Sequence, residues 1–540
     1  MPSVSFELVS ILAAPTSPAA TEAVAVEWER IQLIVTLRGR TEGRVMLVAA
    51  DRGEAHLDSM PADDAPAGTR RVRFNVFAGP GRRPLRAGRW RLVVADGVEP
   101  PEAVRVDAAV DPAWSRDFPH AGGIYRVEAR RVGERAALEI VISELPAATR
   151  KTPTLRRRWI LFQRALRGRL FAWLVRLLRA LPRGRRPLVV FTSDSRATLG
   201  GNLQLVQARM LERGLADRVA IRTVLRPSVR SARSMVDRAR MTWLFARADV
   251  IVLDDYQPAV YKLEPHPRVR IIQLWHAWGA FKTVGFSRIG KSGGPSPYSI
   301  SHRNYTHAIV SSTHEVRFYG EAFCIPDENV IPTGTPRMDQ FLDPDEQAAG
   351  RTRALKAFPR AAGREVILFA PTFRGANAKT ARYPADAVDL EALYDLCTER
   401  DAVAIVKMHP FVRATLDIPP ERSDRILDAS ATPVDVNDLL LIADLLITDY
   451  SSLIFEYAAL GRPMLFYAFD LEEYVASRDF YEPFEAFTPG RIVRTFPELI
   501  EAIRRGDFEQ HKVEPFARRH LPAEPGSATD RIIDQLILAR

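Results

Sequence analysis

Two histidines stand where apolar stretches of the chain end. His276 closes the apolar run 269–276, and His409 lies near the end of the run 403–410. A neutral imidazole exchanges a proton readily near pH 7, so a histidine at a strand end is a candidate general base or acid. One such histidine is more often structural than catalytic. Two of them, at the carboxyl ends of strands in facing domains, would point into one cleft and favour catalysis.

The stretch 445–470, LLITDYSSLIFEYAALGRPMLFYAFD, has the residue types of a phosphate-binding site. An apolar strand runs into Asp449, Ser451 and Ser452, and a helical pattern follows. The start of a helix offers free N–H groups and the positive end of its dipole, and a capping serine there can reach a phosphate oxygen. Glu456, one turn further on, is placed to bind ribose hydroxyls. The alternative is an ordinary strand-turn-helix with a serine cap.

The segment PTFRG at 371–375 follows another strand, and its Arg374 could clamp a phosphate in the same cleft. Apart from Asp343-Pro-Asp345, the sequence contains no Asp-x-Asp pair, and it contains no His/Cys cluster with the spacing of metal ligands. We therefore expect the site to use neither a metal nor another cofactor.

The segment GFSRIGKS at 285–292 satisfies the G-x-x-x-x-G-K-S pattern of a nucleotide-triphosphate loop. Such a loop must follow a strand and open a helix, because the helix N-terminus supplies the N–H groups that hold phosphate. Here Gly293, Gly294, Pro295 and Pro297 follow, and they cannot continue a helix. We interpret the segment as a flexible loop near the active site.

Length and composition point to a globular protein with several domains. A chain of 540 residues is too long for one hydrophobic core, and about three domains are expected. The two cysteines, Cys324 and Cys397, argue against a disulfide framework and fit a reducing cytosol. The N-terminus lacks the pattern of a signal peptide, and no run reaches the roughly 18 apolar residues that span a bilayer. We therefore expect a cytoplasmic protein.

Residues 155–181 are predicted to form one helix with arginines around an apolar stripe. The apolar residues recur at steps of three and four, and no acidic residue occurs anywhere in 145–193. This pattern is typical of a helix lying on an anionic membrane surface, where each basic residue adds about 1 kcal/mol. The alternative is a linker helix whose stripe packs on the next domain. The stripe comprises Trp159, Phe162, Leu166, Leu170, Trp173, Leu177 and Leu181.

The remaining sequence predicts one β-domain and two α/β domains. Short apolar or alternating runs separated by Gly, Pro and Asp clusters predict an antiparallel sandwich before residue 146. Beyond residue 186, apolar strands alternate with helices in two successive sets, which predicts two parallel-sheet domains that face one another. The expected domains are an accessory sandwich at 1–146, a basic amphipathic helix and linker at 147–186, a Rossmann-like acceptor domain at 187–355, and a Rossmann-like nucleotide-donor domain with a C-terminal helix at 356–540.

Six segments of this α/β region resemble the motifs of the CDP-glycerol glycerophosphotransferase family, which includes teichoic acid primases, polymerases and ribitol-phosphate transferases. The resemblance covers about 187–505 and leaves 1–146 outside. Many members carry Trp-His-Gly-Thr-Pro where this chain has Trp-His-Ala-Trp-Gly, which leaves the donor and the primase or polymerase role open. The segments are, in chain order, WHAWGAFK, HRNYTHAIVSS, ENVIPTGTPRMDQF, ILFAPTFRG, VKMHP and ITDYSSLIFEYAALGRPMLFYAFDLEEY.

The resemblance implies an α/β protein with a GT-B fold, in which the two Rossmann-like domains follow the small all-β domain. It also implies a metal-independent transfer in which an acceptor hydroxyl attacks the β-phosphorus of CDP-glycerol or CDP-ribitol and CMP leaves. In the family the acceptor is usually lipid-linked on the cytoplasmic leaflet. The basic helix suits a protein that is peripheral at that inner face of the membrane.

The resemblance assigns roles by position. His276 would be the general base, and His409 would stabilise the reacting phosphate. The turn at 449–452, together with Arg374, would hold the pyrophosphate, and Glu456 would bind the ribose. The further donor-binding candidates are Thr372, Lys407, Asp449, Ser451 and Ser452, and the candidates on the acceptor side are Lys282, Ser311 and Ser312.

Two other functions fit parts of the sequence. A GT-B glycosyltransferase that uses a nucleotide-sugar could employ the same serine turn and Glu456. A catalytically silent, membrane-associated scaffold would retain the β-domain and the basic helix, but the presence of both cleft histidines argues against it. Nucleic acid is not an expected partner, because the arginines of 155–181 share their helix with a Trp/Leu stripe and no base-stacking module is apparent.

Overall fold

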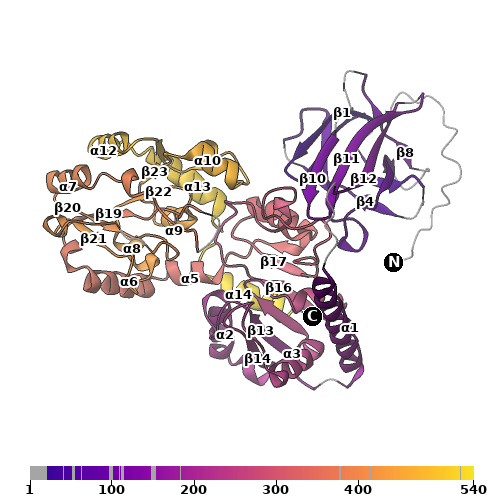
Figure 1. Cartoon of the computed structure of the whole chain (residues 1–540), viewed down its shortest axis with the longest axis horizontal. Helices are drawn as coiled ribbons and strands as arrows, with labels where there is room; N and C mark the ends of the chain where they lie inside the picture. The colour runs from indigo at the N-terminus through magenta and orange to yellow at the C-terminus, as the bar shows by residue number, and fades with distance from the viewer. Residues whose placement is uncertain are drawn as a thin grey trace.

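The computed structural model shows a β-rich domain followed by two α/β domains, with the chain ending on the first of these (Figure 1). Residues 1–20, where the sequence predicts no signal peptide, lie outside the described residues. The structure describes residues 21–539 except 40–41, 52–54, 63, 96–100, 109, 111–114, 135, 148–153, 183, 376–378, 414–415 and 523.

The β-rich domain is one connected, mainly antiparallel sheet that encloses its own core. Strand β2 is buried over almost its whole length, and its Leu33, Val35 and Leu37 face that core. Phe286 and Ile289, from a distant part of the chain, complete the core. The strands are β1 (Glu22–Glu29), β2 (Gln32–Arg38), β3 (Arg44–Ala49), β4 (His56–Asp58), β5 (Met60–Pro61), β6 (Thr69–Asn75), β7 (Gly88–Ala95), β8 (Glu102–Ala103), β9 (Arg105–Val106), β10 (Ser115–His120), β11 (Gly123–Val132) and β12 (Ala137–Pro146).

The segment with the G-x-x-x-x-G-K-S pattern packs against this β-domain. It forms a 3-10 turn, Gly285–Arg288, and no α-helix follows it before Val316. Phe286 is fully buried, and Arg303 stacks over its ring at 4.1 Å while donating to the carbonyl of Phe77. The prediction that this segment is not a nucleotide-triphosphate loop is therefore confirmed. The segment is packed between two domains and does not form the predicted flexible loop.

Helix α1 (Leu155–Ala180) confirms the predicted basic helix almost to the residue. Its Phe171, Val175 and Leu178 pack on the first α/β domain. Trp159, Trp173 and the other members of the predicted stripe instead remain 43–59% exposed. The stripe is thus not the face that joins helix and domain. Among the described helices, none is long and apolar enough to cross a bilayer.

The first α/β domain contains a parallel sheet of order β14-β13-β15-β16-β17-β18. Its strands are almost wholly apolar because helices cover both faces. The elements are β13 (Leu188–Ser193), α2 (Gly201–Glu212), β14 (Ala220–Leu225), α3 (Met235–Arg247), β15 (Val250–Leu253), β16 (Arg270–Gln273), β17 (His307–Ile309), α4 (Val316–Phe323), β18 (Val330–Ile331) and α5 (Pro336–Leu342).

The second α/β domain repeats the arrangement with order β21-β20-β19-β22-β23-β24. Helix α12 begins at a reciprocal capping box, which Thr495 and Glu498 form. The elements are α6 (Pro344–Ala357), β19 (Glu365–Phe369), α7 (Leu390–Glu399), β20 (Ala402–Val406), β21 (Ile426–Asp428), α8 (Val436–Ile442), β22 (Leu445–Thr448), α9 (Leu453–Ala458), β23 (Met464–Tyr467), α10 (Leu471–Ser477), α11 (Phe484–Phe487), β24 (Arg491–Val493), α12 (Phe496–Arg505) and α13 (Val513–His520).

The C-terminal helix crosses back to the first α/β domain. Helix α14 (Ala528–Ile532) and the π-helical turn Ile533–Ile537 bury four apolar side chains against β13 and α2. Arg209 pairs with Asp530 at 2.8 Å and holds the helix there. The chain thus passes between the two domains twice, which ties them together.

The fold class predicted from the sequence is confirmed: a β-rich domain precedes two parallel-sheet domains in a GT-B arrangement. Both described cysteines are free and buried. In each parallel sheet, the residues singled out for chemistry follow the carboxyl ends of the strands, where open α/β sheets bind their ligands.

Candidate active site

His276 lies three residues beyond β16 on a sharply turned backbone. Trp275 adopts a left-handed φ of +51°, and its ring packs on the imidazole with centroids 4.5 Å apart. Surrounding protein atoms lower the pKa of His276, while the negative charge of Asp255 and a hydrogen bond to the backbone of Asp254 oppose this decrease. The residue nevertheless keeps an exposed face. Its ring is therefore neutral at pH 7, oriented by the backbone and able to accept a proton.

Asp254, which follows β15, has a buried carboxylate, and its backbone forms the hydrogen bond to His276. Its Oδ2 pairs with Nη2 of Arg196 at 3.1 Å, and its Oδ1 has no hydrogen-bond partner in the described structure. Burial raises its pKa to about 7 despite the attraction of Arg196. Sequence reasoning missed this residue. The signal was available in the Asp254-Asp255 pair at the end of an apolar strand in the same domain.

His409 lies beyond β20 in the second α/β domain, close to Lys282 of the first. Its Nδ1 accepts a hydrogen bond from the N–H of Phe411 at 3.1 Å. In the neutral ring, Nε2 therefore carries the proton and can donate it. Burial and the positive charge of Lys282 both lower the pKa of His409. The structure thus places Lys282, Nε2 of His409 and the carboxyl edge of the second parallel sheet in one region.

Asp449 is the centre of a buried network at the end of β22. Its Oδ1 accepts from the N–H and the hydroxyl of Thr372 at 2.8 and 2.9 Å. Its Oδ2 accepts from Nη1 of Arg374 at 2.8 Å, and the same guanidinium forms two bonds to Asp470. Asp449 is fully buried and Arg374 is nearly so. These side chains therefore brace the loops after β19, β22 and β23 against one another.

This network bears on the predicted role of Arg374 as a phosphate clamp. Three of its guanidinium nitrogens donate to carboxylates or to the carbonyl of Thr372. Lys407 is engaged in the same way, since its ammonium donates to the carbonyls of Ala429, Thr432 and Val434 at 2.8–3.2 Å. An ammonium has three donors, so all of them are used. Contact of either residue with the donor stays a prediction, and their observed contacts are structural.

The serine turn before α9 differs in detail from the prediction. Ser452 occupies the N-cap position without a side-chain capping bond, and Oγ of Ser451 accepts from the N–H of Leu453 at 3.4 Å. Ser452 is exposed and Ser451 partly so, which leaves both hydroxyls accessible. Glu456 is 6% exposed, its Oε2 has no partner in the described structure, and burial raises its pKa to about 7.

The two serines predicted for the acceptor side are buried. The hydroxyl of Ser311 donates to the carbonyl of Trp278, and its N–H donates to the carboxylate of Glu315. Ser312 is 6% exposed, and its hydroxyl has no partner in the described structure. Ser311 therefore supports the loop that carries Trp278, and its contact with an acceptor stays a prediction.

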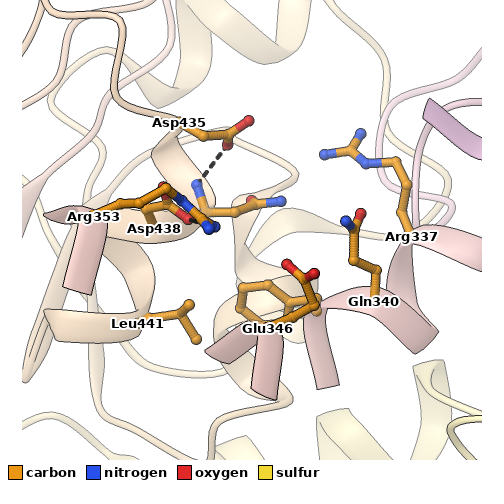
Figure 2. A pocket seen from close by; sticks show the side chains of 9 residues that line it. Arg337, Gln340, Glu346, Arg353, Asp435, Asp438 and Leu441 are labelled. Atoms are coloured by element: carbon orange, nitrogen blue, oxygen red, sulfur yellow. Dashed lines mark hydrogen bonds and ion pairs between the residues drawn. The ribbon is translucent and has the colours of Figure 1, made fainter. Parts of the chain in front are cut away.

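A cavity of about 180 Å³ opens between α5, α6 and α8 (Figure 2). Two of its lining residues, Arg337 and Asp435, act electrostatically on Glu456. Arg337 lies at the start of α5. This guanidinium lies within electrostatic range of His276 and Asp254 on one side and of Glu456 on the other. No ion pair of Arg337 is recorded in the described part of the chain, in contrast to Arg353, which pairs with an aspartate in the same cavity. Sequence reasoning quoted the segment TGTPR without assigning its arginine.

One group of side chains among the described residues has the types and spacing to hold a metal ion. The ligand atoms of His314, Glu482 and His520 lie within 4.8 Å of one another. Glu482 already accepts from Nε2 of His314 at 3.1 Å and pairs with Arg519. Burial lowers the pKa of His520 to about 3. The group lies where the two α/β domains meet, and the proposed chemistry does not involve it.

Two parallel-sheet domains with histidines, cations and an exposed serine turn at their strand ends define a protein of the GT-B fold class. The chain belongs to the CDP-glycerol:poly(glycerophosphate) glycerophosphotransferase family, whose sequence profile matches residues 174–538.

Individual relatives agree with this assignment. Teichoic acid ribitol-phosphate polymerase TarL of Staphylococcus aureus is 45% identical over 348 residues, which cover 64% of this chain and 62% of TarL. Teichoic acid ribitol-phosphate polymerase TarK of the same organism is 44% identical, over 68% of this chain and 72% of TarK. The chain thus matches less than two thirds of the length of TarL. The structure of the wall teichoic acid polymerase TagF superposes with a TM-score of 0.54 at 20% identity, covering 69% of this chain and 96% of TagF, which supports the same fold.

Proposed function

We propose that this chain transfers ribitol phosphate or glycerol phosphate from the corresponding CDP-alditol to a hydroxyl of a lipid-linked acceptor in teichoic acid synthesis. Membership of the family and the neutral, exposed His276 carry this proposal. Both TarL and TarK are named as ribitol-phosphate polymerases, which supports CDP-ribitol as the donor.

The reaction is an exchange of one phosphate ester for another. The acceptor oxygen forms a bond to the phosphorus that bears the alditol, and the bond from that phosphorus to the bridging oxygen of CMP breaks. His276 takes the proton of the hydroxyl as general base. His409 donates from Nε2 to an oxygen of the transferred phosphate, and the positive charge of Lys282 supports it.

The donor is held by the second α/β domain. The hydroxyls and N–H groups of Ser451 and Ser452 bind the diphosphate, and Glu456 accepts from the ribose hydroxyls. Arg337 supplies a positive charge that no recorded ion pair neutralises in the described structure. The network of Asp449 and Arg374 does not touch the donor in this scheme, but it positions the turn that does.

The acceptor reaches the site from a membrane surface. The stripe of α1 is exposed, and no acidic residue occurs within 145–193. Arg176 pairs with Glu264 from outside that range, and the other arginines keep the helix strongly positive. A helix of this kind binds an anionic leaflet through both its apolar face and its charge. We place the protein at the cytoplasmic face of the membrane, where a lipid-linked acceptor is available.

The test distinguishes CDP-ribitol from CDP-glycerol as the donor, and it distinguishes alditol-phosphate transfer from sugar transfer. The purified chain is incubated with lipid-linked acceptor and either CDP-ribitol or CDP-glycerol, and CMP release and product length are followed. We expect CMP release with CDP-ribitol at the higher rate. Thermal stabilisation by a UDP-sugar, with none by CMP or either CDP-alditol, would instead indicate a nucleotide-sugar transferase.

A further inference from the structure

A long groove runs between α1 and α3, on the side of the first α/β domain that carries the basic helix. Its volume is about 1070 Å³. The walls are mostly apolar, and Leu170, which lines the groove, also belongs to the exposed stripe of α1. Trp243 and Met235 of α3 are 48% and 76% exposed at its edge. The groove is therefore continuous with the surface that we propose meets the membrane.

The lining of the groove is strongly basic. It contains one acidic side chain, that of Asp194, and six basic ones. Four of the six have no recorded ion pair in the described structure, so most of this charge is not neutralised within the protein. The basic residues are Arg167, Arg226, Arg233, Arg238, Arg240 and Lys262.

A smaller, more polar cavity of about 180 Å³ adjoins the groove. The two cavities share Arg226, Arg233 and Arg240. Arg226 and Arg233 both pair with the single carboxylate of Asp194, Arg233 at 2.5 Å. Two guanidinium groups on one carboxylate leave a net positive charge; Arg240 adds to it and Asp237, which also lines the smaller cavity, offsets one charge, so the arginine cluster stays net positive. An apolar channel that leads to clustered arginines is complementary to a phosphate on an apolar chain.

The arginine end of the groove lies at the same edge of the sheet as the proposed general base. Asp194 follows β13 and Arg226 follows β14, while His276 lies beyond β16 of the same sheet. Gln257, beyond β15, bridges this edge by donating to Asp194 Oδ1 at 3.0 Å. A ligand whose phosphate sits among the arginines would therefore present its distal part toward the cleft.

We propose that this groove binds the lipid anchor of the acceptor, with its apolar chain between α1 and α3 and its phosphate at the arginine end, on Arg226, Arg233 and Arg240. The inference rests on the proposed function, because it assumes a lipid-linked acceptor. Helix α1 then has two roles, since its outer stripe meets the bilayer and its inner edge forms one wall of a site for a single lipid. An acceptor with a short chain of alditol phosphates reaches His276 while its anchor stays in the groove.

The experiment uses geranyl diphosphate as a soluble probe and calorimetry of the full-length chain. We expect it to bind at least tenfold more tightly than inorganic diphosphate. The double variant Arg238→Glu/Arg240→Glu should weaken that binding at least tenfold. So should Ala239→Trp, which fills the groove from an exposed position. The charge-matched control Arg158→Glu/Arg169→Glu, on exposed positions of α1 outside the groove, should change it less than twofold.

The remaining outcomes separate this inference from the proposed function. Equal affinity for inorganic diphosphate, or unchanged probe binding in both groove variants with wild-type Tm, would refute the groove as a lipid site. Displacement of the probe by dihexanoyl phosphatidylglycerol at equal affinity would make it a site for bilayer phospholipid and overturn the assignment to the acceptor. CMP release by the wild-type chain with a lipid-free alditol-phosphate acceptor tests the proposed function alone.

Discussion

Gly279, three residues after His276, lies directly against the ring of Phe455 in α9. A Cβ at position 279 would come within 2.2 Å of that ring. Phe455 is fully buried and stacks near Phe487 and Phe516, so it has no space to retreat. The loop that carries His276, the proposed general base, thus rests on the helix that begins at the serine turn, and this contact fixes the position of one α/β domain against the other.

We expect Gly279→Ala to separate these two domains. The added methyl group must displace the loop or the ring, at a cost of about 1–3 kcal/mol for overpacking. Donor binding, which uses the second domain, should stay within a few-fold of the wild type, whereas CMP release should fall at least tenfold. Donor titration by calorimetry and single-turnover assays distinguish the two effects. Wild-type turnover would show that the contact does not set the geometry of the cleft.

His276→Ala should lower CMP release by about 10²- to 10⁴-fold, the usual contribution of a general base. Surrounding protein atoms lower its pKa although one face of the ring is exposed, so the ring is neutral, and able to act as a base, at pH 7. The rate should therefore decline only below the usual histidine pKa of about 6.5 as the ring takes a proton. A pH–rate profile of the wild type measures this. If His276→Ala showed the same decline in rate at acid pH, that decline would come from the titration of another group.

Lys282→Gln should raise the pKa of His409. The positive charge of Lys282 disfavours the imidazolium, so its removal makes protonation easier, while the effect of burial remains. NMR titration of the His409 ring in both proteins measures the difference. The control is Lys291→Gln, which removes the same charge. Lys291 pairs with Asp479, and its removal should leave the titration of His409 unaltered.

Arg374→Met should destabilise the second α/β domain by roughly 3–5 kcal/mol, because it leaves the buried carboxylates of Asp449 and Asp470 without their partner. Urea unfolding measures this loss. Arg505→Met removes an exposed pair with Glu501 and should cost no more than about 1 kcal/mol. If Arg374→Met unfolded like the wild type but lost donor affinity, the guanidinium would be a phosphate ligand after all.

The double variant Trp159→Asp/Trp173→Asp should reduce binding to anionic vesicles by more than tenfold. Both side chains are more than half exposed, so the folded domain should retain its Tm. Cosedimentation with phosphatidylglycerol vesicles measures the loss, and wild-type binding should weaken as salt screens the arginines. Leu211→Asp, on an exposed position of α2, is the control. If the double variant bound the vesicles as well as Leu211→Asp does, α1 would have a purely intramolecular role.

Sequence patterns predicted the elements well and the contacts of their side chains poorly. The helix at 155–181 followed from a 3.6-residue period, and the structure begins α1 at Leu155. The same pattern left open whether its stripe faces solvent or protein, and Phe171 and Leu178, which break the pattern, are the residues that pack on the domain. Exposure depends on what lies opposite a helix, which no local period encodes.

In the candidate site, too, the sequence predicted which residues to expect but not the contacts of their side chains. His276, His409 and the serine turn were found from the residue types that follow apolar strands, and parallel sheets bring such positions to one edge. The same reasoning singled out Lys407, but its ammonium donates all three of its hydrogen bonds to backbone carbonyls. Arg337 went unassigned because it follows the short strand β18 at the start of a helix, and only the meeting of two domains brings it near Glu456.

The sequence by itself determined the order of strands and helices, the two-domain α/β architecture and the residue types at the strand ends. These follow from the period of apolar residues and from capping and turn chemistry, which act over a few residues. Only the tertiary structure decided which polar groups are free to act. It paired Arg374 with two carboxylates, left Arg337 without a recorded ion pair among the described residues, and placed Gly279 against Phe455. Those outcomes depend on contacts between segments far apart in the chain or on domains that meet across the cleft, where burial and the nearest charge decide what each side chain does.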